Sequence, residues 1–258
     1  MLRRPAIQFC LSLTFAWLLS VGGSHGAEWV TLKGRFVYDG EPPKTEFLTP
    51  NRDVDMCGKK PIPDDSLVVN SENGGIANII LYPRKKPSAI APSYDETAKD
   101  EVPFDNVVCR FEPHVQLLRT TQQLVVGNKD PKGHNTNFAA ALNAVPNQLI
   151  PALGNFQPKF TIAEPRPVKV DCNIHPWMSA YLVVKDHPYI AKTDEDGNFE
   201  IKDLPVGEKL DFRVWHESSG WVRKVKSEEI KFGKKGFKVT MTKDIDLGTV
   251  KVDPKSFD

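Results

Sequence analysis

Alternating hydrophobic and polar residues recur along most of the chain and predict β-strands. The clearest case is residues 29–38, where apolar side chains occupy one face and polar side chains the other. A two-residue period is typical of a strand with one buried face. The same pattern or a short apolar run predicts strands at 67–69, 76–82, 107–118, 123–128, 137–142, 160–163, 168–172, 180–185, 190–193, 199–201, 210–215, 237–241 and 245–247. No long segment has a helical period, so the predicted fold class is all-β, with the strands packed as sandwiches.

Three segments between these strands have the composition of loops. Residues 41–65 are rich in proline and charge, and residues 83–105 carry basic residues followed by Pro, Ser, Asp and Glu. Residues 143–158 contain Pro146, Pro151 and Gly154. Such composition favours turns and irregular backbone. We therefore expect loops at 41–65 and 143–158, and a solvated linker or long loop at 83–105.

Composition sets broad limits on the function. The chain has 258 residues, of which 40% are hydrophobic, enough for one large or two small domains. The net charge is +1, and removal of residues 1–26 with Arg3 and Arg4 takes it to −1. A nearly neutral chain gives no reason to expect nucleic acid or an anionic membrane as a partner.

The N-terminus has the pattern of a secretory signal peptide over residues 1–26. Arg3 and Arg4 precede an apolar run from Ile7 to Val21, and the small residues Ser24 and Gly26 precede Ala27. The alternative is an uncleaved membrane anchor. No later apolar run is long enough to cross a bilayer. We therefore expect a periplasmic or otherwise exported protein with no integral membrane span after cleavage.

The stretch from Cys172 to Met178 carries the candidate chemistry. Its sequence, Cys-Asn-Ile-His-Pro-Trp-Met, places a thiolate, an imidazole and a thioether close together. Copper takes such donors, and two histidines, one cysteine and a weak axial methionine describe a blue-copper electron-transfer site. The second histidine must come from elsewhere, and His134 in Gly133-His134-Asn135 is the best candidate. The alternative is a buried cysteine and histidine that only pack.

The remaining cysteines predict a disulfide. Cys10 falls in the signal peptide, which leaves Cys57, Cys109 and Cys172. Exported compartments permit disulfides, and an odd cysteine count asks for an explanation, which a thiolate ligand at Cys172 supplies. Cys57 and Cys109 then remain as a natural pair. The alternative is that they are two separate buried thiols.

The motif Cys-x-x-His-Pro-x-Met after an upstream Gly-His-Asn resembles the copper loop of the cupredoxins, the blue copper proteins. Its short spacing is most similar to the amicyanin- or plastocyanin-like loop, and the similarity covers about residues 107 to 186. The resemblance implies a Greek-key sandwich over residues 106–186 that binds one mononuclear copper ion. It implies His134, Cys172 and His175 as strong ligands and Met178 as the weak one.

The resemblance also implies roles for neighbouring residues. Asn135 would tie the two ligand loops together, and Pro176 and Trp177 would line an apolar shell around the metal. In the family, the histidine at the position of His175 emerges at an apolar patch where a redox partner docks. The implied partner is a redox protein such as a c-type cytochrome or a dehydrogenase.

A second resemblance concerns the two ends of the sequence. Thr193-Asp194, Gly197, Phe199 and Leu204-Pro205-Val206-Gly207 resemble a carboxypeptidase-regulatory-like β-sandwich, and residues 34–40 resemble its opening strand. We therefore expect a small sandwich split between residues 28–92 and 188–254, around an inserted copper domain. One continuous β-rich protein without this partition is the alternative.

These features favour an exported electron carrier over other classes. A non-redox protein that binds an envelope component or carbohydrate, and a copper carrier, remain as alternatives. We do not expect an enzyme, because one electron-transfer copper has no open coordination position for a substrate.

Overall fold

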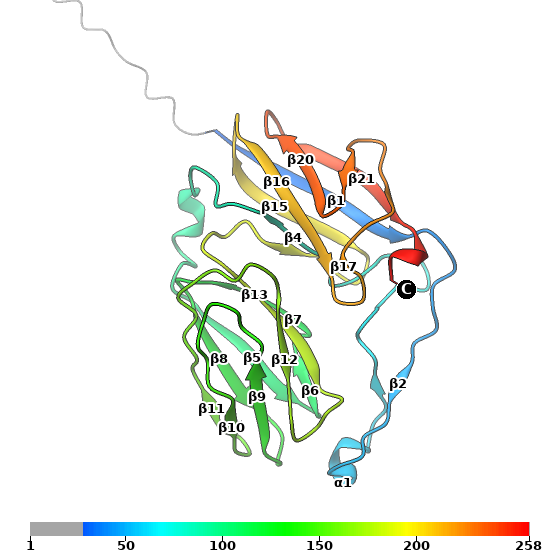
Figure 1. The fold of residues 1–258 in the computed structure, drawn as a ribbon, viewed down its shortest axis with the longest axis vertical. Coiled ribbons are helices and arrows are strands. Elements are labelled where there is room, and N and C mark those ends of the chain that lie inside the picture. Colours follow the sequence, from blue (N-terminus) through cyan, green and yellow to red (C-terminus); the bar gives the residue numbers. More distant parts are fainter. Residues whose placement is uncertain (1–27, 258) are drawn as a thin grey trace, which may run out of the picture.

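The computed structural model describes residues 28–257, and the predicted signal peptide lies outside the described residues. Two β-sandwiches lie one above the other in Figure 1, which confirms the predicted all-β class. We call them the terminal sandwich and the central sandwich, after the parts of the sequence that form them. Among the described residues, no helix has the length and apolar character needed to cross a membrane.

The terminal sandwich consists of two sheets. One has the order β15 (Asn198–Pro205), β1 (Trp29–Tyr38), β21 (Ile245–Val252) and β18 (Val225–Lys226). The other has the order β14 (Ala191–Lys192), β4 (Ile80–Pro83), β16 (Lys209–His216), β20 (Gly236–Thr240) and β19 (Phe232–Gly233), with β17 (Gly220–Trp221) paired to β16. Apolar side chains from both sheets, among them Leu32, Phe36, Phe212 and Val250, form one core.

The two ends of the sequence share these sheets. β1 pairs antiparallel with β15 and parallel with β21, and β4 pairs antiparallel with β16. Each end thus supplies strands whose hydrogen-bonding partners come from the other end, as the split sandwich requires. The domain limits themselves stay a prediction.

The central sandwich also has two sheets. The first has the order β10 (Gln148–Ile150), β9 (His134–Phe138), β12 (Val168–Asp171), β13 (Ser179–Lys185) and β7 (Val115–Arg119). The second has the order β11 (Asn155–Phe156), β8 (Gln123–Asn128), β5 (Glu101–Val107) and β6 (Arg110–Glu112). Its core includes Phe104, Leu124, Val170 and Leu182. A small cluster with Tyr82, Val183 and Trp215 packs at the junction of the two sandwiches.

A long arm runs from the terminal sandwich down to the central one (Figure 1). It carries β2 (Phe47–Leu48), α1 (Val54–Cys57) and β3 (Ile62–Pro63), and β2 pairs with β3. A disulfide joins Cys57 to Cys109 with a Cα–Cα distance of 5.5 Å. Cys57 and Ile62 are buried in the core of the central sandwich. The arm is therefore a structural part of the central sandwich, although its residues fall in the segment 28–92.

Two 3₁₀ turns, η1 (Pro92–Tyr94) and η2 (Pro254–Ser256), complete the described elements.

Several predicted boundaries are wrong. The expected linker 83–105 contains the start of β5, and the expected strand 107–118 is broken into the end of β5, then β6 and β7. The break comes from Val108 and Cys109, which have φ angles of 49° and 57°. This left-handed conformation is rare for a β-branched residue. Both backbone N–H groups donate to the Asp130 carboxylate, at 2.7 and 2.8 Å, so the turn is held by a residue that the local pattern does not reveal.

Acid should destabilise the fold through His216, which is 1% exposed. Burial lowers the pKa of His216 to about 4, whereas an unfolded histidine titrates near 6.5. Between these values the unfolded chain binds the extra proton, so stability falls as the pH drops from about 6.5 to about 4. One such group contributes a slope of about 1.4 kcal/mol per pH unit.

Urea unfolding of the wild type and His216→Gln at pH 7 and pH 5 checks this expectation. The variant should lose less stability between the two pH values than the wild type. An equal loss in both proteins would contradict it.

Candidate metal centre

The segment Cys172–Met178 forms a short closed loop between two paired strands. β12 ends at Asp171, β13 begins at Ser179, and the two strands pair antiparallel. The backbone N–H of Met178 donates to the His175 carbonyl at 2.9 Å, and the N–H of Cys172 donates to the Met178 carbonyl at 3.1 Å. These bonds hold Cys172 and His175 on a loop with little conformational freedom.

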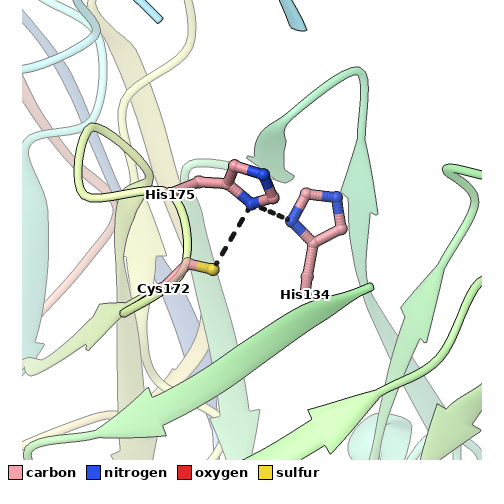
Figure 2. A group of neighbouring side chains, drawn as sticks. All are labelled: His134, Cys172 and His175. Carbon is pink, nitrogen blue, oxygen red and sulfur yellow. Dashed lines mark hydrogen bonds between the residues drawn. The ribbon is translucent and has the colours of Figure 1, made fainter. Parts of the chain in front are cut away.

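Three potential ligand atoms converge at this loop. Figure 2 shows His134, from the start of β9, facing Cys172 and His175. The Nδ1 atoms of the two histidines are 2.9 Å apart, and the Cys172 Sγ lies 3.8 Å from the His175 Nδ1. All three donor atoms lie within 4.8 Å of one another, and all three side chains are buried. Residues 38 or more positions apart in the sequence are therefore brought to one point.

A carboxylate orients each histidine ring from behind. The Asp130 Oδ2 lies 2.9 Å from the His134 Nε2, and the Asp53 Oδ2 lies 2.9 Å from the His175 Nε2. A neutral imidazole has one N–H, and a carboxylate accepts it from Nε2, so a lone pair is left on each Nδ1. Histidine ligands of metals usually donate their other nitrogen in this way. Two imidazole lone pairs and one cysteine sulfur fit a metal with a preference for nitrogen and sulfur.

The charges around the ligands favour a thiolate. Burial raises the pKa of the Cys172 thiol, but hydrogen bonds from His134 and from backbone N–H groups of Asn135 and His175 bring it below its ordinary value. Burial lowers the pKa of His134, but hydrogen bonds with Asp130 and Cys172 raise it to about 9. Burial also lowers the pKa of His175, against the effect of Asp53. In the metal-free protein, the positive charge at the site is thus held by His134.

Asn135 connects the two ligand segments. Its Oδ1 accepts the backbone N–H of Asn173 at 2.8 Å and that of Ile174 at 3.2 Å, and it lies 3.5 Å from the Cys172 Sγ. Its Nδ2 donates to the Oδ1 atoms of Asn147 and Asn173. The Asn135 side chain therefore fixes the start of the Cys172–Met178 loop relative to β9.

The other sequence-predicted residues surround the loop in different ways. Met178 is 2% exposed and lies in the central core with Cys172. The Trp177 ring packs on the His175 ring with 5.1 Å between their centroids, and its Nε1 donates to the Cys109 carbonyl. Pro176 is exposed. A hollow of about 250 Å³ beside the loop is lined in part by Cys109, Trp177 and Met178.

The expectation that His175 emerges at the surface is wrong. Its side chain is 0% exposed, because Asp53 on the arm covers the ring edge that carries Nε2. Asp53 also pairs with Lys132, at 3.2 Å, and its own side chain is 30% exposed. The hydrogen bond of His175 lowers the pKa of the Asp53 carboxyl group. The outermost group on this side of the site is thus a carboxylate instead of an imidazole.

Sequence reasoning missed Asp53 and Asp130. Asp130 stands four positions before His134, so its spacing could have suggested it. Asp53 lies 122 positions from His175 in a segment without regular pattern. Asp130, His134 and Cys109 also form a close group, but Cys109 is in a disulfide and has no thiolate to offer.

Comparisons with known proteins give distant likenesses only. No family model and no curated protein matches the sequence. Among solved structures, the copper-containing nitrite reductase (NirK) from Thermus scotoductus SA-01 is 18% identical with a TM-score of 0.28, over 33% of this chain and 22% of that chain. A reduced amicyanin mutant is 18% identical with a TM-score of 0.29, over 41% of this chain and 98% of that chain. A Cu(I) form of another amicyanin mutant has 18% identity and a TM-score of 0.30, with the same coverage. The chain spans less than a quarter of the nitrite reductase.

Removal of Asn135 should weaken the metal-free fold at this site. Asn135→Ala leaves the N–H groups of Asn173 and Ile174 without their acceptor, and such a loss costs about 1–3 kcal/mol. Asn147→Ala is the matched control, since Asn147 is exposed and bonds only to side chains of this network. Urea unfolding should find Asn135→Ala clearly less stable than Asn147→Ala. Equal stabilities would show that Asn135 does not hold the loop.

Proposed function

We propose that the protein is an exported one-electron carrier that holds a single copper ion between His134, Cys172 and His175, with Met178 as a weak fourth ligand. The observation that carries this proposal is the convergence of two imidazole Nδ1 atoms and one cysteine sulfur, all buried. Each imidazole is already oriented by a carboxylate. The site therefore needs little rearrangement to receive a metal.

The donor set favours copper over other metals. Thiolate and thioether are soft ligands, imidazole suits copper and zinc, and copper binds most tightly in the series of divalent first-row metals. When bound, copper supplies a one-electron couple between Cu(II) and Cu(I). The chain supplies a closed loop and a buried environment, which limit how far the ligands move between the two oxidation states.

The proposal implies electron transfer instead of catalysis. Four protein ligands leave no open position for a substrate, so we do not expect an enzyme. The partner would be a redox protein such as a c-type cytochrome or a dehydrogenase. A signal peptide at residues 1–26 would place both in the periplasm or another exported compartment.

The covered histidine suggests where electrons leave the site. A hydrogen bond joins the His175 Nε2 to Asp53, which is partly exposed. Next to it, Val54 on α1 is 55% exposed. We propose that the partner docks against this end of the arm. Cys57, at the end of α1, anchors that surface to the central sandwich through its disulfide.

The same cover counts against copper carriage, the alternative function. A site closed by Asp53 and by the disulfide-anchored arm retains its ion, whereas a carrier must release it to an acceptor. Transfer of Cu(I) to a chelator separates the two functions. An electron carrier should release copper over hours, and a copper carrier within minutes.

Copper(II) added to residues 27–258 should give an intense blue band from thiolate-to-copper charge transfer. Cys172→Ala should lack the band, because no thiolate remains. Met178→Leu should keep the colour and raise the reduction potential, since a weak donor to Cu(II) is lost. Visible spectra and redox titration measure both effects. A colourless complex, or binding that is unchanged in Cys172→Ala, would contradict the proposed site.

Asp53→Asn should raise the reduction potential of the copper-loaded protein. Asparagine keeps an acceptor for His175, but the lost negative charge no longer favours the more positive Cu(II) state. A change of about 1 kcal/mol corresponds to roughly 40 mV for one electron. Asp55→Asn is the control, because Asp55 pairs with Lys132 at 3.6 Å and its side chain is 73% exposed. Equal shifts in the two variants would show that the contact with His175 has no special effect.

A further inference from the structure

A basic hollow lies where the two sandwiches meet, away from the ligand loop. Its volume is about 810 Å³, and its lining comes from β4, β16 and β17 of the terminal sandwich and from residues 163–166 and 185–187 next to the central one. The junction of β4, β16 and β13 can be followed in Figure 1. Six cationic side chains line it: Arg84, Lys86, Arg166, Lys185, Arg213 and Lys235.

The two acids of the hollow offset only part of these six positive charges. Glu164 and Asp186 are its acidic lining residues. The Glu164 carboxylate already accepts three backbone N–H groups and the Asn143 amide. Arg213 pairs with Asp211. Within residues 28–257, the other five cations form no ion pair with a carboxylate.

Lys185 is the cation that most requires a partner. It is 6% exposed, and its Nζ donates to the Glu164 backbone carbonyl and lies 4.0 Å from the centre of the Tyr82 ring. A buried charge is costly unless it is paired and hydrogen-bonded. In keeping with this, burial lowers the pKa of Lys185 to about 8.

Tyr82 supplies a second, independent sign of a missing partner. It is 2% exposed, and its hydroxyl group has no hydrogen-bond partner among the described residues. Tyr82 is itself one of the residues that line the hollow, together with Arg166 and Arg213. Buried hydroxyl groups are nearly always bonded. A bound anion would accept a hydrogen bond from the Tyr82 hydroxyl and would pair with the neighbouring cations.

We propose that this hollow binds a small anion with several oxygen atoms, through the Tyr82 hydroxyl, Lys185 and the surrounding arginines and lysines. The class includes phosphate groups and carboxylates. Because residues of both sandwiches line the hollow, a bound anion would fasten the two to each other. The site is separate from the proposed copper ligands and does not depend on them.

Calorimetric titration of the full mature protein with inorganic phosphate and with citrate tests the proposal. Saturable binding of either anion is expected, and the tighter one indicates whether phosphorylated compounds or polycarboxylates are the natural class. Tyr82→Phe removes one hydroxyl group with little change of shape, and it should weaken binding roughly tenfold, in keeping with a lost hydrogen bond to a charged group. Circular dichroism should be unchanged.

Lys235→Gln and Lys234→Gln form a matched pair, since both lysines are exposed and Lys235 alone of the two lines the hollow. Lys235→Gln should weaken binding severalfold, and Lys234→Gln should bind as the wild type does. No saturable binding of either anion to the wild type, or equal binding by Tyr82→Phe, Lys235→Gln and the wild type, would overturn the proposal.

Discussion

Two imidazole nitrogens that face each other at 2.9 Å need a proton or a metal ion between them, because two facing lone pairs repel. His134 and His175 are in this position, and Cys172 adds a sulfur that is stabilised as a thiolate. A proton on His134 meets the need in the metal-free protein, and a metal ion would meet it for all three donors at once.

Asp130 and Asp53 show how the scaffold does this. Asp130 binds the His134 ring and also the two N–H groups of the Val108–Cys109 turn. Cys109 is disulfide-bonded to Cys57, and α1, which ends at Cys57, starts next to Asp53, the partner of His175. A closed chain of contacts therefore links both histidines through one turn, one disulfide and two carboxylates. The contacts that stabilise the arm therefore also orient the His175 ring.

The sequence predicted the parts of this arrangement that are local. Cys172, His175 and Met178 fall within seven residues at the end of an alternating strand, and His134 is marked by its neighbours Gly133 and Asn135. The contact of Asp53 with His175 depends on the path of an irregular arm over 122 positions, which no local pattern encodes. The prediction that His175 lies at the surface was wrong for this reason. The left-handed turn at Val108 was missed because its support, Asp130, lies 22 positions away.

The proposed electron carrier requires one copper ion bound by two imidazoles and one thiolate. X-ray absorption at the copper edge of the loaded, full mature protein tests it most directly, because the signal comes only from atoms bound to the metal. The account predicts one short sulfur neighbour and two imidazole nitrogen neighbours, in both Cu(II) and Cu(I), with small changes in distance between them. A spectrum with only oxygen and nitrogen neighbours, or one whose sulfur neighbour persists in Cys172→Ala, would contradict it.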